Sequence, residues 1–267
     1  VAKSGAPYST ITAAQTAITD ASSSKIYTVL VFPGEYDEAI TLKDYVNIIA
    51  IDPFNTYILQ RVKTNLDPVH CSLKINIDNR KAGHQGLYVI ADGSIIHIEG
   101  NIIGGANNAG ITLTCAGTIT VLNGNVIGGD NCHGIFNNSA GTIKVINGNV
   151  IGGDGVDGGF GIYNMLGGKV TVLNGNIIGG NGESKGGKGI WNDQTGLVLV
   201  KNGYITNPGM NATDYPIWGG NITLIDCTIV GNHADVPAIY ASSAKNVKLM
   251  NVWSNRDLHS NITNLIP

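Results

Sequence analysis

The sequence predicts an all-β fold, namely a single-stranded, right-handed parallel β-helix with three strands per coil and a short N-terminal capping helix. Two observations predict it. Three short strand signals recur in every unit of 22–28 residues over residues 86–253, with no helical period between them. Glycine supplies 37 of the 267 residues, whereas 16 are Lys or Arg and 19 are Asp or Glu, a composition typical of short strands joined by tight turns. The coils are expected to wind in a right-handed sense because crossover connections between parallel strands are almost always right-handed.

Three markers define the repeat. The string Asn-(Val/Ile)-Ile-Gly-Gly recurs at steps of 24, 24 and 27 residues, beginning at Asn101, Asn125, Asn149 and Asn176. A Gly-Ile pair begins at Gly110, Gly134, Gly161 and Gly189. The third marker is an alternating apolar–polar–apolar triplet, such as Ile119-Thr120-Val121 and Ile143-Lys144-Val145. Because stacked units bury one continuous core, each strand is expected to pair with its counterpart one coil away.

Asparagine and glycine recur at one predicted corner of the coils. The tripeptide Asn-Gly-Asn begins at Asn123, Asn147 and Asn174. Both residue types tolerate the left-handed backbone conformation that tight turns need. Asparagine side chains stacked at one corner can hydrogen-bond along the stack, which favours a structural role for them over a catalytic one.

The whole chain, residues 1–267, is predicted to be one domain with four segments. They are an N-terminal cap with the first strands (1–52), less regular coils (53–85), regular coils (86–253) and a tail (254–267). The tail has no repeat partner, so it is expected either to cap the far end of the solenoid or to lead toward a further segment.

The N-terminal segment is expected to cover the open end of the solenoid. Ser9 or Thr10 can cap a helix predicted over Thr10–Ala21, whose apolar residues fall on one face. Strands are predicted at Tyr27–Phe32 and Val46–Ile51. An uncovered end would expose unpaired strand edges, which favour aggregation.

Two stretches of this segment resemble a known family. Residues 8–15 and 29–38 are similar to the start of pectin-lyase-like right-handed β-helix proteins, a group that includes phage tail spikes. The string Gly34-x-Tyr36-x-Glu38 is similar to the first motif of pectin methylesterases. The resemblance covers about 50 residues, and it implies a β-helix fold.

The catalytic motifs of these relatives are missing from the sequence. Pectin methylesterases carry Gln-Asp-Thr-Leu, Asp-Phe-Ile-Phe-Gly and Leu-Gly-Arg-Pro-Trp, and polygalacturonase-like enzymes carry Asp-Asp, Gly-His-Gly and Arg-Ile-Lys. Pectate lyases use a strand arginine, yet no Arg lies between Arg80 and Arg256. The sequence therefore disfavours the best-known chemistries of this family.

An aromatic stripe is the first candidate site. Aromatic residues follow the Gly-Ile marker or its looser equivalents in most coils, and they are Tyr88, Phe136, Tyr163, Trp191, Trp218 and Tyr240. Thr112 interrupts the series. If the preceding isoleucines point inward, the alternation of a strand turns the aromatics outward, where they form a carbohydrate-binding platform with a spacing of about 4.8 Å per coil. The alternatives are an internal aromatic stack and a surface covered by a partner chain.

A second candidate is the pair Asp130 and Asp154, which follow the Ile-Gly-Gly string in successive coils, with His133 in the adjoining loop. Two neighbouring carboxylates share a proton, bind a cation such as Ca²⁺ or act as an acid/base pair. The alternative is that they are solvated turn residues. The connections at this corner lengthen in later coils, at 154–160, 181–188 and 207–215, as binding-side insertions do.

Two further positions bear on packing. His97 aligns with Val121 when counted from the repeat, which predicts an inward, hydrogen-bonded histidine. The pairs Val126-Ile127, Val150-Ile151 and Ile177-Ile178 place one aliphatic side chain of each pair outside the coils. Such a strip predicts a covered face, and hence self-association, with a homotrimer as one form. The alternative is that the tail, residues 254–267, covers it.

Composition limits the function classes. A net charge of −3 and three Arg disfavour nucleic acid, and no apolar run reaches the about 18 residues of a membrane span. The four Cys lack metal-site spacing, so no cofactor is expected apart from the Ca²⁺ option.

The sequence thus favours a non-catalytic or carbohydrate-recognising surface module. Part of a phage tail spike or fibre, or of a cell-surface protein, would fit, and its place would be extracellular or on a virion surface. The alternatives are a polysaccharide-degrading enzyme (a lyase, glycoside hydrolase or pectinesterase-like enzyme) that uses the corner carboxylates, and a structural spacer.

Overall fold

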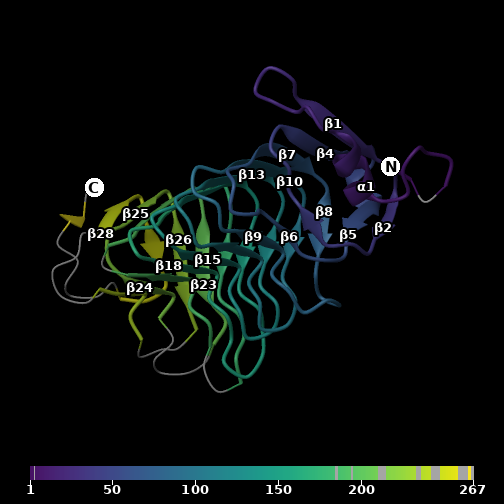
Figure 1. Ribbon diagram of the computed structural model, residues 1–267. Helices are drawn as coiled ribbons and strands as arrows, with labels where there is room; N and C mark the ends of the chain where they lie inside the picture. Colours follow the sequence, from purple (N-terminus) through teal and green to yellow (C-terminus); the bar gives the residue numbers. More distant parts are fainter. Residues whose placement is uncertain are drawn as a thin grey trace.

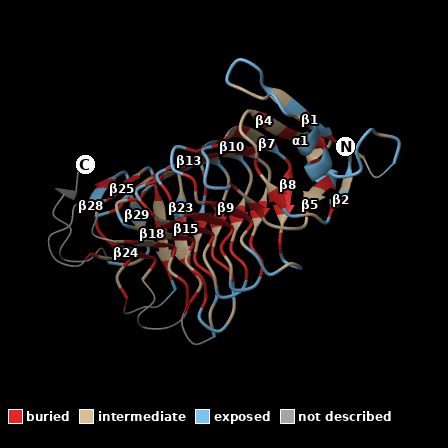
Figure 2. Cartoon of the chain, in the orientation of Figure 1, coloured by how far each residue is buried: buried red, intermediate tan, exposed pale blue. Residues whose placement is uncertain are grey.

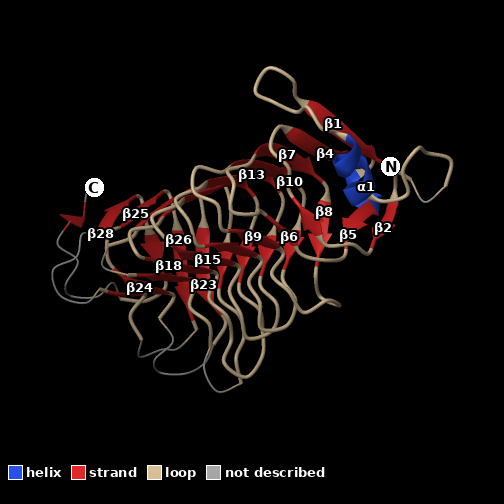
Figure 3. Ribbon diagram, in the orientation of Figure 1, coloured by secondary structure: helices blue, strands red, loops and turns tan. Residues whose placement is uncertain are grey.

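A computed structural model shows a right-handed parallel β-helix of about nine turns with three strands per coil (Figure 1). It describes residues 1–2, 4–183, 186–193, 195–209, 215–232, 236–241, 247–257 and, for the backbone alone, 264–265. Within these residues the coils stack along one axis, and the single α-helix lies at the N-terminal end of the stack (Figure 3). The predicted fold class is confirmed.

Three sheets run the length of the described chain, and neighbouring strands within each sheet pair in parallel. Sheet I contains β1 (Tyr27–Val31), β4 (Val46–Ala50), β7 (His70–Lys74), β10 (Ile95–Glu99), β13 (Thr118–Asn123), β16 (Thr142–Asn147), β19 (Lys169–Leu173), β22 (Leu197–Lys201), β25 (Ile222–Ile225), β28 (Val247–Met250) and β30 (Asn264–Leu265). Sheet II contains β2 (Gly34–Tyr36), β5 (Thr56–Ile58), β8 (Asn76–Asp78), β11 (Ile102–Ile103), β14 (Val126–Ile127), β17 (Val150–Ile151), β20 (Ile177–Ile178), β23 (Tyr204–Asn207), β26 (Thr228–Gly231) and β29 (Trp253–Ser254). Sheet III contains β3 (Ile40–Thr41), β6 (Val62–Lys63), β9 (Leu87–Val89), β12 (Ile111–Leu113), β15 (Ile135–Asn138), β18 (Ile162–Met165), β21 (Ile190–Asn192), β24 (Ile217–Gly219) and β27 (Ile239–Tyr240).

The core is a set of aliphatic columns. In sheet III, Ile111 pairs with Ile135, Ile135 with Ile162 and Ile162 with Ile190, and each of these side chains is fully buried. Figure 2 shows such buried positions running through the stacked strands. Because strand side chains alternate between faces, this register fixes which residues face outward in every coil.

The N-terminal cap contains α1, which spans Ile11–Ala17 with Thr10 as its N-cap. The Thr10 hydroxyl accepts a hydrogen bond from the Ala13 amide at 3.1 Å. The helix ends four residues before the predicted Ala21, because the backbone of Ile18 is already extended (φ −87°, ψ 112°). Its buried face, Ile11, Ala14 and Gln15, belongs to the predicted apolar face.

The residues of the Gly34-x-Tyr36-x-Glu38 string have structural roles here. Glu38 accepts hydrogen bonds from the amides of Ile11 (2.7 Å) and Thr12 (2.9 Å) at the first turn of α1. The fully buried Tyr36 donates its hydroxyl proton to the Phe32 carbonyl at 2.9 Å. Gly34 has a φ of 149°, which a side chain would disfavour. The string therefore joins the cap to the first coil.

The remaining parts follow the predicted plan with small differences. Residues 53–85 continue the three sheets through strands β5 to β8, with a short 3₁₀ helix at Pro53–Asn55. The first two strands of sheet I, β1 and β4, each end one residue before the predicted boundary. Most of the tail lies outside the described residues, and its β30 pairs with β28.

The corner asparagines form the predicted ladders. On the exposed ladder, the side-chain amide of Asn147 donates to Asn123 at 3.3 Å, that of Asn174 to Asn147 at 3.3 Å, and that of Asn202 to Asn174 at 2.9 Å. A parallel ladder joins Asn149 to Asn125, through both its backbone and side-chain nitrogens at 3.0 Å. These contacts confirm hydrogen bonding along the stack.

A third asparagine ladder lies inside the solenoid, and the sequence analysis did not identify it. Asn137, Asn164 and Asn192 belong to strands β15, β18 and β21 of sheet III, and all three are fully buried. Asn137 donates to Asn164 at 3.0 Å, and Asn164 donates to Asn192 at 2.7 Å. Each also donates to the carbonyl of a glycine four residues later in the chain.

The prediction for His97 is wrong. His97 is exposed and pairs with Thr120 instead of Val121. A β-bulge between Ile98 and Glu99 shifts the register by one residue, so counting backwards from Asn101 gives the wrong partner.

Candidate functional site

The aromatic stripe lies on the outer face of sheet III. Five of its members occupy equivalent positions in β15, β18, β21, β24 and β27, and we call them the aromatic column: Phe136, Tyr163, Trp191, Trp218 and Tyr240. The isoleucine before each is fully buried, whereas each aromatic side chain is half-buried. Of the two directions that the sequence left open, the isoleucines point inward and the aromatics face outward.

The rings of the aromatic column contact one another without a gap. Trp191 and Trp218 stack with centroids 4.7 Å apart and planes 7° apart, and Phe136 and Tyr163 stack at 5.3 Å and 27°. Trp218 and Tyr240 are parallel within 11° at 6.3 Å. Tyr163 meets Trp191 at a right angle, 88°, with centroids 4.5 Å apart. These are offset-stacked and edge-to-face geometries, so the column presents ring edges and partly covered faces to solvent.

Tyr88, the sixth predicted member, stands apart from the aromatic column. Thr112, only 5% exposed, occupies the coil between Tyr88 and Phe136. The Arg61 guanidinium lies over the Tyr88 ring at 5.8 Å, a cation–π contact. Tyr88 is thus on the same face, with a separate partner.

His133 packs against the aromatic column, as does Phe160, which the sequence reasoning missed. The His133 ring stacks on Phe160 at 4.9 Å and meets Tyr163 edge-on at 4.9 Å. Its Nδ1 accepts a hydrogen bond from the Phe160 amide at 3.1 Å. Burial lowers the pKa of His133 to about 4, so the imidazole is neutral and carries its proton on Nε2. Phe160 directly precedes the Gly-Ile marker at Gly161, and this position in the repeat could have predicted that it lies beside the aromatic residues.

The column is bordered by a fixed carboxylate. Asp193 accepts hydrogen bonds from the amides of Leu166 (2.7 Å), Thr195 (2.8 Å) and Gly196 (2.7 Å). These amides lower the pKa of Asp193 although its partial burial opposes them. Burial, with the charge of Asp193, raises the pKa of the Tyr163 phenol, which is therefore protonated at neutral pH.

Asp130 and Asp154 lie at a different place, on exposed positions of the corner after sheet II. They line a groove of about 390 Å³, here called the corner groove, together with the outward-facing Ile103, Ile127 and Ile151 and their glycine pairs. The Asp154 carboxylate accepts a hydrogen bond from the Asn181 amide at 2.7 Å. The structure brings the two aspartates to one groove, whereas His133 packs against the aromatic column.

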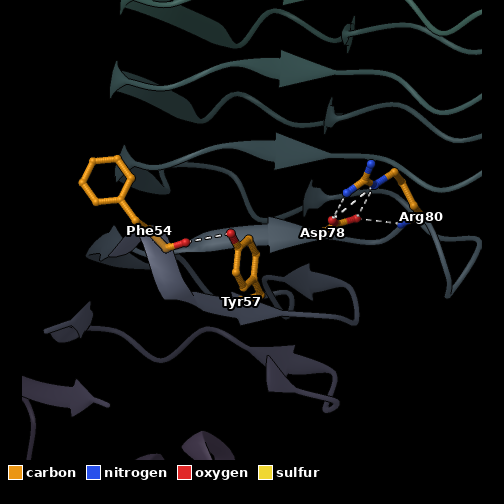
Figure 4. A network of polar contacts seen from close by, with 4 residues as sticks. All are labelled: Phe54, Tyr57, Asp78 and Arg80. Carbon is orange, nitrogen blue, oxygen red and sulfur yellow. Dashed lines mark hydrogen bonds and ion pairs between the residues drawn. The ribbon is translucent and has the colours of Figure 1, made fainter. Parts of the chain in front are cut away.

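Arg80 lines the same groove from the preceding coil, and its charge is already paired. Figure 4 shows the guanidinium folded onto Asp78, with Nη2 2.6 Å and Nε 3.0 Å from the carboxylate oxygens. This pairing lowers the pKa of Asp78 and raises that of Arg80. In the same view Tyr57 donates to the Phe54 carbonyl at 2.7 Å, while the Phe54 ring points away and is 84% exposed.

In the part of the chain that the structure describes, no group of three or more His, Cys, Asp or Glu could hold a metal ion. No helix there has the length and apolar character of a membrane span. Ca²⁺ binding by Asp130 and Asp154 stays a prediction.

In the aliphatic strip of sheet II, one residue of each pair points outward, as predicted. Val126, Val150 and Ile177 are fully buried, while Ile127, Ile151 and Ile178 are half-buried on the outer face. Self-association through this strip stays a prediction. Of the lengthening corner loops, residues 154–160 are described throughout, and the next two lie partly outside the described residues.

Comparison with protein-family models, with curated proteins and with solved structures gives no match to this chain. The fold is a parallel β-helix. Function must be inferred from the surfaces of that fold.

Proposed function

We propose that this chain is a non-catalytic, carbohydrate-recognising β-helix surface module of the pectin-lyase-like type, and that the aromatic column is its binding surface. The observation that carries the proposal is an unbroken, half-exposed line of five aromatic rings on one outer face. Such a module fits part of a phage tail spike or fibre, or of a cell-surface protein, outside a cell or on a virion.

The spacing of the column favours a linear polymer. Its members recur once per coil, about 4.8 Å apart, so a chain of sugar rings laid parallel to the solenoid axis meets an aromatic group at each step. The parts of the ring faces that stacking leaves uncovered attract the weakly positive C–H groups of sugars, the positive ring edges attract sugar oxygens, and the indole N–H and phenol O–H groups supply hydrogen bonds at the rim.

Two placements support a non-catalytic module over a polysaccharide-degrading enzyme. His133 is neutral and packed among rings, whereas Asp130 and Asp154 line the corner groove. An acid/base pair must reach the same bond of a substrate, so His133, on another surface, does not serve as the partner of either aspartate.

The test is binding to a polysaccharide and glycan panel by the intact chain and by Trp191→Ala and Trp218→Ala variants. Each variant should lose at least about fivefold in affinity, because it removes a central ring worth roughly 1–3 kcal/mol. Trp253→Ala is the matched control, since Trp253 is 59% exposed on sheet II and should leave binding unchanged. Equal binding by all four proteins would overturn the proposal.

A further inference from the structure

Five Asn-Gly steps occur in the chain, and the structure places them in two different surroundings. Four lie at the corner after sheet I, where their asparagines form the exposed ladder: Asn123, Asn147, Asn174 and Asn202. The fifth, Asn181-Gly182, lies at the corner after sheet II, at the start of the connection 181–188. All five asparagines are exposed, so exposure alone does not distinguish them.

An Asn-Gly step is chemically reactive because glycine has no Cβ to hinder its backbone nitrogen. That nitrogen attacks the side-chain carbon Cγ of the asparagine, and a C–N bond forms. The side-chain nitrogen takes up the proton of the glycine amide and leaves as ammonia, which closes a five-membered succinimide ring. Water then opens the ring at one of its two carbonyl carbons and gives aspartate or isoaspartate. Because the carboxamide must first rotate toward the glycine nitrogen, hydrogen bonds to either group oppose the reaction.

The exposed ladder engages the carboxamides of its four members. The two interior members, Asn147 and Asn174, each donate to the preceding coil and accept from the following one, at 2.9 to 3.3 Å. Asn123 accepts from Asn147, and the nitrogen that would attack it is also engaged, since the Gly124 amide donates to the Asn147 carbonyl at 3.1 Å. Asn202, the last member, makes a single ladder bond. Reaction at an interior step therefore requires two ladder bonds to break.

Asn181 differs because only its backbone is engaged. Its amide donates to the Asp154 carboxylate at 2.7 Å, and its carbonyl accepts from the Gly155 amide at 3.2 Å. Within the residues that the structure describes, neither the Asn181 carboxamide nor the Gly182 amide makes a hydrogen bond. The two reacting groups are thus neighbours in the chain, and no hydrogen bond opposes their approach.

We propose that Asn181 is the site of spontaneous deamidation in this chain, and that the exposed ladder protects the other four Asn-Gly steps. The conversion adds a carboxylate directly after an Ile-Gly-Gly string, the position that Asp130 and Asp154 occupy in the two preceding coils. The isoaspartate product also inserts a methylene group into the backbone beside the bridge between Gly155 and Gly182. The reaction therefore changes both the charge and the backbone of this corner. It does not depend on the function proposed for the aromatic column.

The experiment is peptide mapping by mass spectrometry, with fragmentation to locate each converted residue. The full chain is incubated in mildly alkaline buffer, once folded and once unfolded in guanidinium chloride. In the folded chain Asn181 should convert at least about tenfold faster than Asn147 and Asn174, because each of these must break two ladder hydrogen bonds. Asn202, with one ladder bond, should convert at an intermediate rate. In the unfolded chain all five steps should convert at similar rates.

Two variants separate the effect of the fold from that of the sequence. Asn181→Gln should abolish the conversion at this position, because glutamine must close a larger ring. Asn147→Ala removes the acceptor of the Asn174 carboxamide, so Asn174 should convert severalfold faster while Asn181 stays unchanged. Equal rates at Asn181 and at the interior ladder steps of the folded chain would overturn the proposal. So would the same excess at Asn181 in the unfolded chain, or an unchanged rate at Asn174 in the Asn147→Ala variant.

Discussion

The regular coils and the N-terminal cap are stabilised in different ways. In the coils a residue type recurs at one position, and its side chains form columns, such as Asn137, Asn164 and Asn192 inside. In the cap, single contacts between unlike residues stabilise the structure, such as the hydrogen bonds of Glu38 with the first turn of α1. A change in a column therefore affects its neighbours above and below, whereas a change in the cap should stay local.

The largest effect is expected where coils touch through backbone alone. A Cβ on Gly153 would lie 1.8 Å from the Gly129 carbonyl oxygen, so Gly153→Ala must separate two coils. We expect a loss above about 4 kcal/mol in the free energy of unfolding, measured by chemical denaturation. Gly83→Ala is the control, because its site has open space and a φ of 64°, and it should lose only about 1 kcal/mol. Equal losses would contradict tight packing of the corner.

The buried asparagine ladder comes next. Asn164→Ala removes the partner of Asn137 and of Asn192, and leaves polar groups buried without hydrogen bonds. The expected loss is about 3 kcal/mol. Asn147→Ala on the exposed ladder should lose less than about 1 kcal/mol, since water replaces its bonds. Similar losses for both variants would show that burial does not distinguish the two ladders.

His133 should make the coils sensitive to acid. Its pKa is lowered to about 4 in the folded chain against about 6.5 when unfolded, so the unfolded state binds the proton first. Stability should therefore fall as the pH drops from about 6.5 to 4, by up to about 3 kcal/mol. Thermal unfolding across this range measures it. His133→Phe should remove this component, and His97→Phe, at an exposed site, should not.

The smallest effect belongs to the cap. Glu38→Gln leaves one acceptor oxygen where the carboxylate had two, so the amide of Ile11 or Thr12 loses its bond. The cost should be about 1–2 kcal/mol. Hydrogen exchange should become faster in α1 while β13 to β22 stay protected. Faster exchange throughout the coils would contradict the local character of the cap.

The sequence predicts the repeating coils better than it predicts contacts between residues without a repeat partner. The repeat predicts the coils, and a period of two places the isoleucines and the aromatics on opposite faces. It leaves open which of the two faces inward. A signal for the buried ladder was also present, since an Asn directly follows each of Phe136, Tyr163 and Trp191. Strand alternation places these asparagines on the face opposite the aromatics, but periodicity does not say which buried polar side chains find hydrogen-bond partners.

Two kinds of feature could not be predicted. Register shifts are local, and the bulge at Ile98 moved His97 to the outside. Contacts between residues without a repeat partner depend on the full fold, as with His133 on Phe160. The stacking of the rings likewise depends on side-chain rotamers, which no spacing rule fixes.

The most direct test of the central claim uses the tryptophans themselves. The chain has three, so Trp253→Phe leaves Trp191 and Trp218 in the aromatic column as the only indole reporters. When this variant is titrated with a polysaccharide that the intact chain binds, its fluorescence should shift to shorter wavelength as the indoles lose water. Binding with unchanged emission would place the sugar elsewhere and contradict the account.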